Sequence, residues 1–291
     1  MGKNSEITWT HHTFNPWWGC TKLSEACTYC YAEAWSKRTG VRIWGPAAER
    51  RFFKKEHWDE PIKWNKQAKK TGERKRVFCA SMADVLEDRR DLDTWRQRLW
   101  RLIEDTSWLD WLVLTKRPEN FAKMIPWSNT WPPNVWIGTT VENQKRAKQR
   151  IPMLLQYPAP IKFVSCEPLL GPVDLSRWLN HPNNKRPYKG LDWVIVGGES
   201  GFCARPMHPL WGRNLRDQCS AAEVPFHFKQ WGCWKPLENG VKSRVRTLRL
   251  DAPESESVTF VWKGKKASGR DLDGRVWDEI PLAPINGIAC R

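Results

Sequence analysis

Three cysteines that lie close together in the chain have the side chains best suited to hold a metal. Cys20, Cys27 and Cys30 fall within eleven residues, with six residues between the first two and two between the last two. A two-residue spacing lets both thiolates turn toward one metal. Three thiolates without a fourth cysteine nearby suit a four-iron, four-sulfur (4Fe-4S) cluster with one open iron, because a structural zinc site takes four protein ligands. A zinc site completed by His11 or His12, and cysteines that are merely buried, are the alternatives.

The 291-residue chain is strongly basic and rich in tryptophan. It has 48 Lys and Arg against 32 Asp and Glu, which gives a formal net charge of +16, and it has 21 tryptophans. This charge favours a polyanionic partner such as a nucleic acid or a nucleotide, although a solvated basic surface would give the same balance. Indole rings can stack on bases, but most of them are expected in the core.

The pattern of cysteines and apolar residues predicts a cytoplasmic protein without a membrane segment. The nine cysteines are an odd number and most are scattered, and residues 1–12 are polar. This pattern indicates free thiols in a reducing compartment and no secretory signal. No stretch approaches the roughly 18 to 20 apolar residues that span a bilayer.

Short apolar runs alternate with amphipathic segments after residue 76, a pattern typical of a parallel sheet covered by helices. The class is therefore α/β, and we predict a full or partial (β/α) barrel over residues 1–235, with a doubly wound open sheet as the alternative. The expected strands cover residues 7–10, 77–81, 111–115, 135–139, 161–166, 193–196 and 225–228. The expected helices cover residues 31–38, 92–103, 118–124, 147–155 and 211–222.

Two segments stand outside this alternation. Residues 41–76 are basic, irregular in pattern and interleaved with aromatic residues, which predicts a nucleic-acid surface or a solvated connector. Residues 236–291 carry the turn signal Asp273-Gly274 and predict a C-terminal extension, a lid or hairpin layer that packs on the barrel.

Polar or ionisable residues follow each expected strand, and in a parallel barrel the functional residues gather at these carboxyl ends. We therefore predict that they line one cavity. The glycines among them would let the backbone approach an anion, and the cations suit a phosphate or carboxylate. Ordinary turns, helix starts and ion pairs are the alternative roles. The candidate catalytic residues are Lys116, Arg117, Glu142, Glu167, Glu199 and Lys229, and the other candidates are Ser81, Asp84, Thr115, Gly197 and Gly198.

Several motifs give the chain a specific resemblance to a known family. Cys27-Thr28-Tyr29-Cys30 matches the end of the radical S-adenosyl-L-methionine (SAM) motif, in which an aromatic residue precedes the last cysteine. The chain as a whole resembles the phage-encoded and bacterial three-cysteine-motif proteins, which are phage proteins of unknown function regarded as radical-SAM-like. The segments that carry this resemblance are "TFNPWWGCTKLSEACTYCYAEAWSKR", "VLTKRPENF", "WIGTTVEN", "CEPLLGPV", "LDWVIVGGESGFCARPMHP", "VPFHFKQWG" and "GRDLDGRVWDEIP".

The resemblance implies a barrel of the radical SAM type with a 4Fe-4S cluster on the three cysteines. SAM would bind the open iron, and its reductive cleavage, driven by an external electron donor, would give a 5′-deoxyadenosyl radical. Tyr29 would lie beside the cluster, and Ser81 and Asp84 would contact the amino-acid part of SAM. The chain departs from the commonest pattern in two ways: the first cysteine gap is longer, and the second strand lacks Gly-Gly-Glu.

These observations predict a radical-SAM-like iron–sulfur enzyme that acts on a nucleic acid or nucleotide. The alternative is a non-enzymatic, zinc-stapled nucleic-acid-binding protein that uses the same three cysteines. A protein partner is compatible with either prediction, and a membrane partner is not expected.

Overall fold

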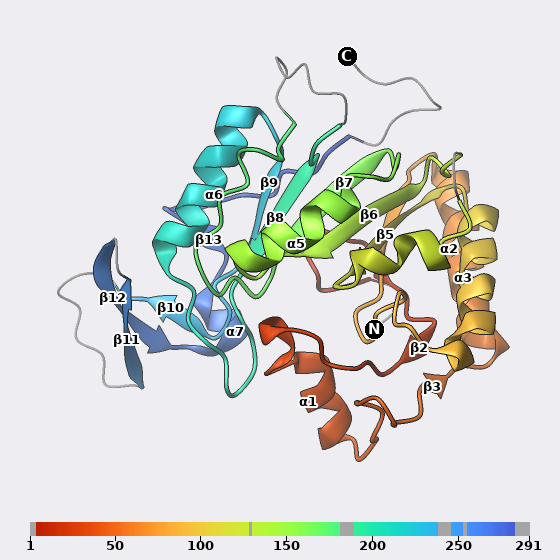
Figure 1. The fold of residues 1–291 in the computed structure, drawn as a ribbon, viewed down its shortest axis with the longest axis horizontal. Coiled ribbons are helices and arrows are strands. Elements are labelled where there is room, and N and C mark those ends of the chain that lie inside the picture. Colours follow the sequence, from red (N-terminus) through yellow and green to blue (C-terminus); the bar gives the residue numbers. More distant parts are fainter. Residues whose placement is uncertain (1–3, 128–129, 181–188, 238–245, 253–254, 283–291) are drawn as a thin grey trace.

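The main feature of the fold is a seven-stranded parallel sheet whose strands follow the order of the chain (Figure 1). The computed structural model describes residues 4–127, 130–180, 189–237, 246–252 and 255–282. Every neighbouring pair of strands in the sheet is parallel. The strands are β1 (His12–Thr13), β4 (Lys75–Cys79), β5 (Leu109–Thr115), β6 (Val135–Thr140), β7 (Ile161–Cys166), β8 (Trp193–Gly197) and β9 (Phe226–Gln230).

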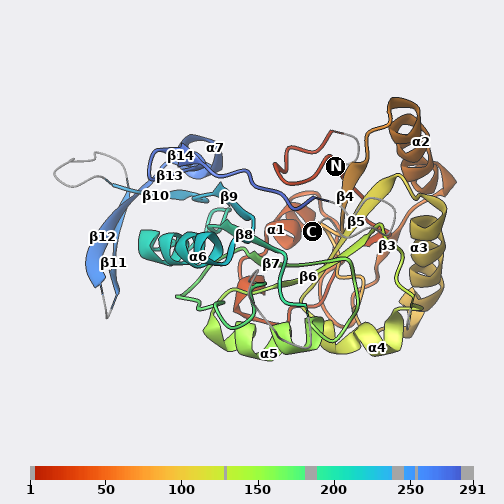
Figure 2. The same cartoon turned by 90° about the horizontal axis from the view of Figure 1, so that it is seen from above.

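The connecting helices lie around the outside of this curved sheet (Figures 1 and 2). Because the strand order never reverses, right-handed crossovers place these helices on the same face. A doubly wound sheet requires a reversal, so that alternative is wrong and the prediction of a partial (β/α) barrel is confirmed. The outer helices are α2 (Lys55–Thr71), α3 (Asp93–Asp105), α4 (Phe121–Met124), α5 (Gln144–Leu154) and α6 (Pro209–Ala222), and α1 (Tyr31–Arg38) lies at the carboxyl ends of the strands.

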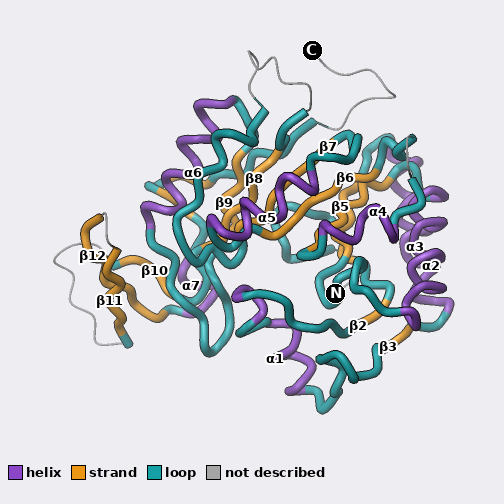
Figure 3. Tube along the Cα trace, in the orientation of Figure 1, coloured by secondary structure: helices purple, strands orange, loops and turns teal. Residues whose placement is uncertain are grey.

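Helix α2 packs beside α3 and was not expected from the sequence (Figures 2 and 3). Its buried face carries Trp58, Pro61, Trp64 and Ala68, a helical spacing of large and small residues. Proline lacks the backbone N–H and usually breaks a helix when it lies in the interior. Pro61 therefore argued against a helix in this part of the sequence. The expectation that residues 41–76 are irregular is therefore wrong for residues 55–71.

The segment that precedes β1 connects the two edge strands of the sheet, β1 and β9. The strand expected at residues 7–10 is wrong in position, because these residues turn before β1, with the N–H of Thr10 donating to the carbonyl of Ile7 at 3.2 Å. The hydroxyl of Thr8 lies 2.8 Å from Nε2 of His227 on β9, the opposite edge strand. The six other expected strands overlap those observed.

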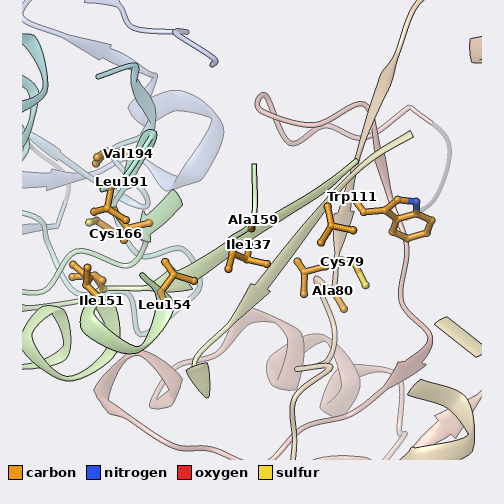
Figure 4. Packing of buried hydrophobic residues seen from close by; sticks show 14 of the residues in the cluster. Cys79, Ala80, Trp111, Ile137, Ile151, Leu154, Ala159, Cys166, Leu191 and Val194 are labelled. Atoms are coloured by element: carbon orange, nitrogen blue, oxygen red, sulfur yellow. The ribbon is translucent and has the colours of Figure 1, made fainter. Parts of the chain in front are cut away.

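The core forms two layers, one on each face of the sheet. The outer layer, between sheet and helices, includes Cys79, Trp111, Ile137 and Cys166 (Figure 4), so these two cysteines are core residues. Successive residues of a strand point to opposite faces, so the other layer fills the inside of the curve. Its members are Trp9, Phe78, Leu112, Trp136, Ile161, Phe163, Trp193 and Ile195.

The C-terminal part adds small antiparallel sheets to the barrel. One projects from its side (Figure 1) and has the order β10 (Trp234–Pro236), β12 (Ser255–Trp262), β11 (Thr247–Ala252). After α7 (Gly264–Ser268) comes the predicted hairpin of β13 (Asp271–Leu272) and β14 (Arg275–Val276). Asp273 and Gly274 have φ angles of 55° and 73°, as this turn requires. Leu272 is buried in the outer core, and a domain boundary at residue 235 stays a prediction.

No helix in the described ranges is long and apolar enough to cross a membrane.

Candidate functional site

A cavity of about 170 Å³ lies between the cysteine segment and the carboxyl ends of the strands. It brings together most of the residues singled out from the sequence. Glu142, Gly197 and Gly198 are not among its lining residues. The predicted residues that do line it are Cys20, Cys27, Tyr29, Cys30, Ser81, Asp84, Thr115, Lys116, Arg117, Glu167, Glu199 and Lys229.

The cysteine segment lies between two short strands that pair antiparallel, β2 (Trp17–Trp18) before it and β3 (Arg51–Phe52) after it. Gly19 follows β2 with φ +114°, and a Cβ there would lie 2.3 Å from the carbonyl oxygen of Ile43. Only glycine allows this close approach. Its N–H donates to the carbonyl of Met82, which fixes the start of the segment against the loop after β4.

The three thiols border the cavity but do not form a closed metal site. All three cysteines are free. Across the described ranges, no three His, Cys, Asp or Glu side chains stand close enough together to hold a metal ion. Burial raises the pKa of the Cys20 thiol to about 12 and also raises the pKa of Cys30. A nearby positive charge or a bound metal favours the thiolate forms of Cys20 and Cys30 against this effect of burial.

The two histidines that could complete a zinc site, His11 and His12, make other contacts, away from the cavity that the cysteines border. Nδ1 of His11 accepts a hydrogen bond from the N–H of Arg76 at 2.8 Å, and burial lowers the His11 pKa to about 4. His12 stacks on Trp64 with ring centroids 4.5 Å apart. Neither histidine is among the residues that line the cavity.

A buried ion pair of Asp84 and Arg117 joins the strand ends to the cysteine segment. Nη1 of Arg117 lies 2.9 Å from Oδ2 of Asp84 and 3.8 Å from Sγ of Cys20, and Nη2 donates to the carbonyl of Thr21 at 2.7 Å. Asp84 also accepts from the Thr115 hydroxyl at 2.7 Å. Burial alone would raise the Asp84 pKa, but the guanidinium and these donors hold it below its ordinary value.

A second ion pair lines the cavity at the ends of β7 and β9. Nζ of Lys229 donates to both carboxylate oxygens of Glu167, at 2.6 and 2.7 Å. The side chain of Gln230 donates to the same carboxylate at 3.3 Å. This arrangement offers a proton donor and a proton acceptor side by side in the cavity wall.

Glu199, after β8, is paired with Arg205. Nε of Arg205 donates to the Glu199 carboxylate at 2.8 Å. The same guanidinium lies 5.1 Å from the centre of the Tyr29 ring and donates to the carbonyl of Glu25. Arg205 therefore ties the cysteine segment to the end of β8, as Arg117 ties it to the end of β5.

Glu142 and the glycine pair have local structural partners outside the cavity lining. Glu142 is fully buried and accepts from Nη1 of Arg150 at 2.7 Å. A Cβ on Gly198 would lie 1.9 Å from the carbonyl oxygen of Trp231, so glycine is required by the packing of two backbones. Glu142 precedes α5, which begins at Gln144, and Arg150 stands eight residues later, so the i,i+4 rule for helix faces could not reveal this pair from the sequence.

Arg50 supports the cysteine segment from outside the cavity lining and was not singled out from the sequence. Its side chain is fully buried and pairs with Glu87 through Nη2 at 2.7 Å. The guanidinium also donates to the carbonyl of Ala48 and the hydroxyl of Thr21. Within a run of basic residues, nothing in the sequence separates this buried arginine from its exposed neighbour Arg51.

The fold and the site together define a partial (β/α) barrel with a cysteine-bordered cavity at the carboxyl ends of its strands. The family described as "Protein of unknown function (DUF5131)" matches residues 4–281, and the chain belongs to this family. A comparison with curated proteins finds no match.

Among solved structures, the chain is similar to a cysteine-to-serine mutant of spore photoproduct lyase, at 10% sequence identity and a TM-score of 0.46. The match covers 90% of this chain and 71% of that chain. A likeness at this level carries no conclusion about activity.

Proposed function

We propose that this protein is a radical-SAM-like iron–sulfur enzyme, with Cys20, Cys27 and Cys30 as the ligands of a 4Fe-4S cluster. The observation that carries the proposal is the shared cavity: three thiols from one segment border the same space as the polar strand ends. Cavities at this end of a parallel barrel are where the loops of such folds place their chemistry.

The chemical groups that line the cavity are of the types that an iron–sulfur cluster requires. Thiolates are the ligands that iron–sulfur clusters take. Arg117 lies beside the sulfur of Cys20, and the charge of Lys116 lowers the pKa of Cys30 against the effect of burial. Both cations favour the thiolate forms. The side chains have to move closer together to bind one cluster.

When bound, a 4Fe-4S cluster supplies the electron for reductive cleavage of SAM. The residues of the chain would hold the reactants around it. Tyr29 and Ser81 line the cavity beside the cysteines, as the resemblance implies for SAM. Thr115 donates a hydrogen bond to Asp84, and the two residues would act by holding Arg117 in place.

Charged residues of the cavity would orient the substrate. In the part of the chain that the structure describes, the ammonium of Lys116 has no hydrogen-bond or ion-pair partner, so it is free to take a phosphate or carboxylate. The pair of Glu167 and Lys229 would accept and return a proton at the substrate.

The first test is metal analysis of protein purified and reconstituted without oxygen. We expect about four iron and four sulfide per chain, and formation of 5′-deoxyadenosine when SAM and dithionite are added. Dithionite replaces the external electron donor. A colourless protein with one zinc and no iron would refute the proposal and favour the zinc-stapled nucleic-acid-binding protein.

The proposed partner is a nucleic acid or nucleotide. The support is the net charge of +16 and the segment 41–76, which has twelve Lys and Arg against five Asp and Glu. Part of that segment is α2, whose outer face is exposed and rich in lysine. The net charge predicts binding through phosphates.

Binding to labelled single-stranded and double-stranded oligonucleotides should weaken steeply with salt. Between about 50 and 200 mM salt, the dissociation constant is expected to rise by roughly a thousandfold for a duplex, and by several hundredfold for a single strand, if about six phosphates are contacted. Fluorescence anisotropy across a salt series measures this slope. Absent or salt-insensitive binding would make the charge a plain property of the surface.

A further inference from the structure

One charged contact inside the site has a consequence for electron transfer. Arg117 and Asp84 are both buried, with relative exposures of 7% and 5%. Nη1 of the guanidinium contacts both the carboxylate and the sulfur of Cys20, 2.9 Å from Oδ2 and 3.8 Å from Sγ. Both members of the pair therefore act on this sulfur in opposite senses: beyond the effect of burial, the Asp84 carboxylate raises the pKa of the Cys20 thiol and the Arg117 guanidinium lowers it.

This arrangement is held rigidly from several sides. The N–H of Lys116 and the hydroxyl of Thr115 both donate to Asp84, and the same hydroxyl oxygen accepts from the N–H of Arg117 at 2.9 Å. The other end of the guanidinium is fixed on the carbonyl of Thr21, next to Cys20. The charge cannot turn away from the sulfur without breaking these bonds.

Other charges near Cys20 are arranged differently. Glu87 also acts on this thiol, but it is neutralised by the buried Arg50. Arg146 holds the cysteine segment from outside, through the side chain of Glu25 at 2.9 Å, and is part of an exposed pair. Arg117 is thus the cation in direct contact with a cysteine sulfur, in the described part of the chain.

We propose that Arg117 is a positioning residue that sets the reduction potential of the cluster, and that Asp84 acts on the same potential in the opposite sense. The inference rests on the proposed function. Reduction adds one negative charge to the cluster, so a fixed cation at a ligand sulfur stabilises the reduced state and raises the potential. Net charge and hydrogen bonds to the sulfurs are known controls of this potential, and at these distances inside a protein a unit charge has a large effect.

Removing the two charges separately should therefore shift the potential in opposite directions. Arg117→Gln removes the cation and is expected to lower the potential, with a change of about tenfold or more in the equilibrium constant for reduction, or about 59 mV for one electron. Asp84→Asn leaves the cation without its counter-charge and is expected to raise the potential. The double variant should lie between the two single variants.

The experiment is a redox titration of the reconstituted full-length protein, followed by the electron paramagnetic resonance signal of the reduced cluster, without SAM. Arg146→Gln is the matched control, because it removes an arginine that anchors the cysteine segment without touching a sulfur. Its potential should equal that of the wild type. Arg117→Lys keeps the charge and should stay closer to the wild type than Arg117→Gln.

The possible outcomes separate this inference from the proposed function. A wild-type protein that takes up no iron refutes both. A loaded wild type with equal potentials in all variants refutes the role of Arg117 alone. Shifts in the same direction in both single variants would show a loosened loop and also refute it. If Arg117→Gln does not retain iron, a raised potential in Asp84→Asn with an unchanged potential in Arg117→Lys supports the inference, and any other pair of values refutes it.

Discussion

Replacing any one of Cys20, Cys27 and Cys30 by alanine is expected to abolish retention of the cluster. The three thiols come from one segment and border one cavity, and a cluster with one open iron has no ligand to spare. Iron and sulfide analysis of each reconstituted variant measures the loss, which we expect to be at least about tenfold. Formation of 5′-deoxyadenosine should fall to the level without protein.

Cys203→Ala is the control for these variants, because Cys203 is an exposed free cysteine outside the cavity lining. It should bind as much iron as the wild type. Full iron content or undiminished 5′-deoxyadenosine in any one of the three cavity variants would show that the assigned ligand set is wrong. Loss of zinc without any iron in the wild type would instead fit the zinc alternative.

The second large effect is expected from Arg50→Met. This substitution leaves the Glu87 carboxylate buried, with a relative exposure of 3%, and without its partner. Breaking a buried pair on one side destabilises proteins by about 3–5 kcal/mol. The carbonyl of Ala48 and the hydroxyl of Thr21 lose their donor as well. Urea unfolding followed by tryptophan fluorescence measures the free energy of unfolding.

Arg51→Met makes the same change one residue later and serves as the control. Arg51 is exposed and lies 4.7 Å from the centre of the Trp18 ring, a contact worth about 0.5–1 kcal/mol at the surface. Equal unfolding free energies for the two variants would show that Arg50 does not hold the cysteine segment together.

The strands that carry the site could be predicted because their short runs of apolar residues are typical of buried strands and not of helices. Continuous apolar runs such as 111–114 are too short for helices and are bounded by polar residues, here Asp110 and Thr115. Their parallel register then places Thr115 opposite Thr139 and Cys79 opposite Val113, so the strand ends meet at one edge. The cavity follows from that register.

The partners inside the cavity could not be predicted, because they depend on contacts between distant parts of the chain. Arg117 meets a sulfur 97 residues before it. Glu142 and Glu167 each follow a strand in the same way, yet only Glu167 lines the cavity. Helix α2 was missed for a local reason, since Pro61 interrupts the pattern that its tryptophans would otherwise have given.

The aromatic layer inside the curve of the sheet gives the cavity an apolar wall. Trp9 and Phe78 of this layer line the cavity, and the contact of Thr8 with His227 joins the two edge strands of the sheet. A reactant in the cavity would therefore meet aromatic rings on one side and charged strand ends on another. A cavity of about 170 Å³ has no room for a polymer, so a nucleic-acid partner would have to insert a single unstacked nucleotide.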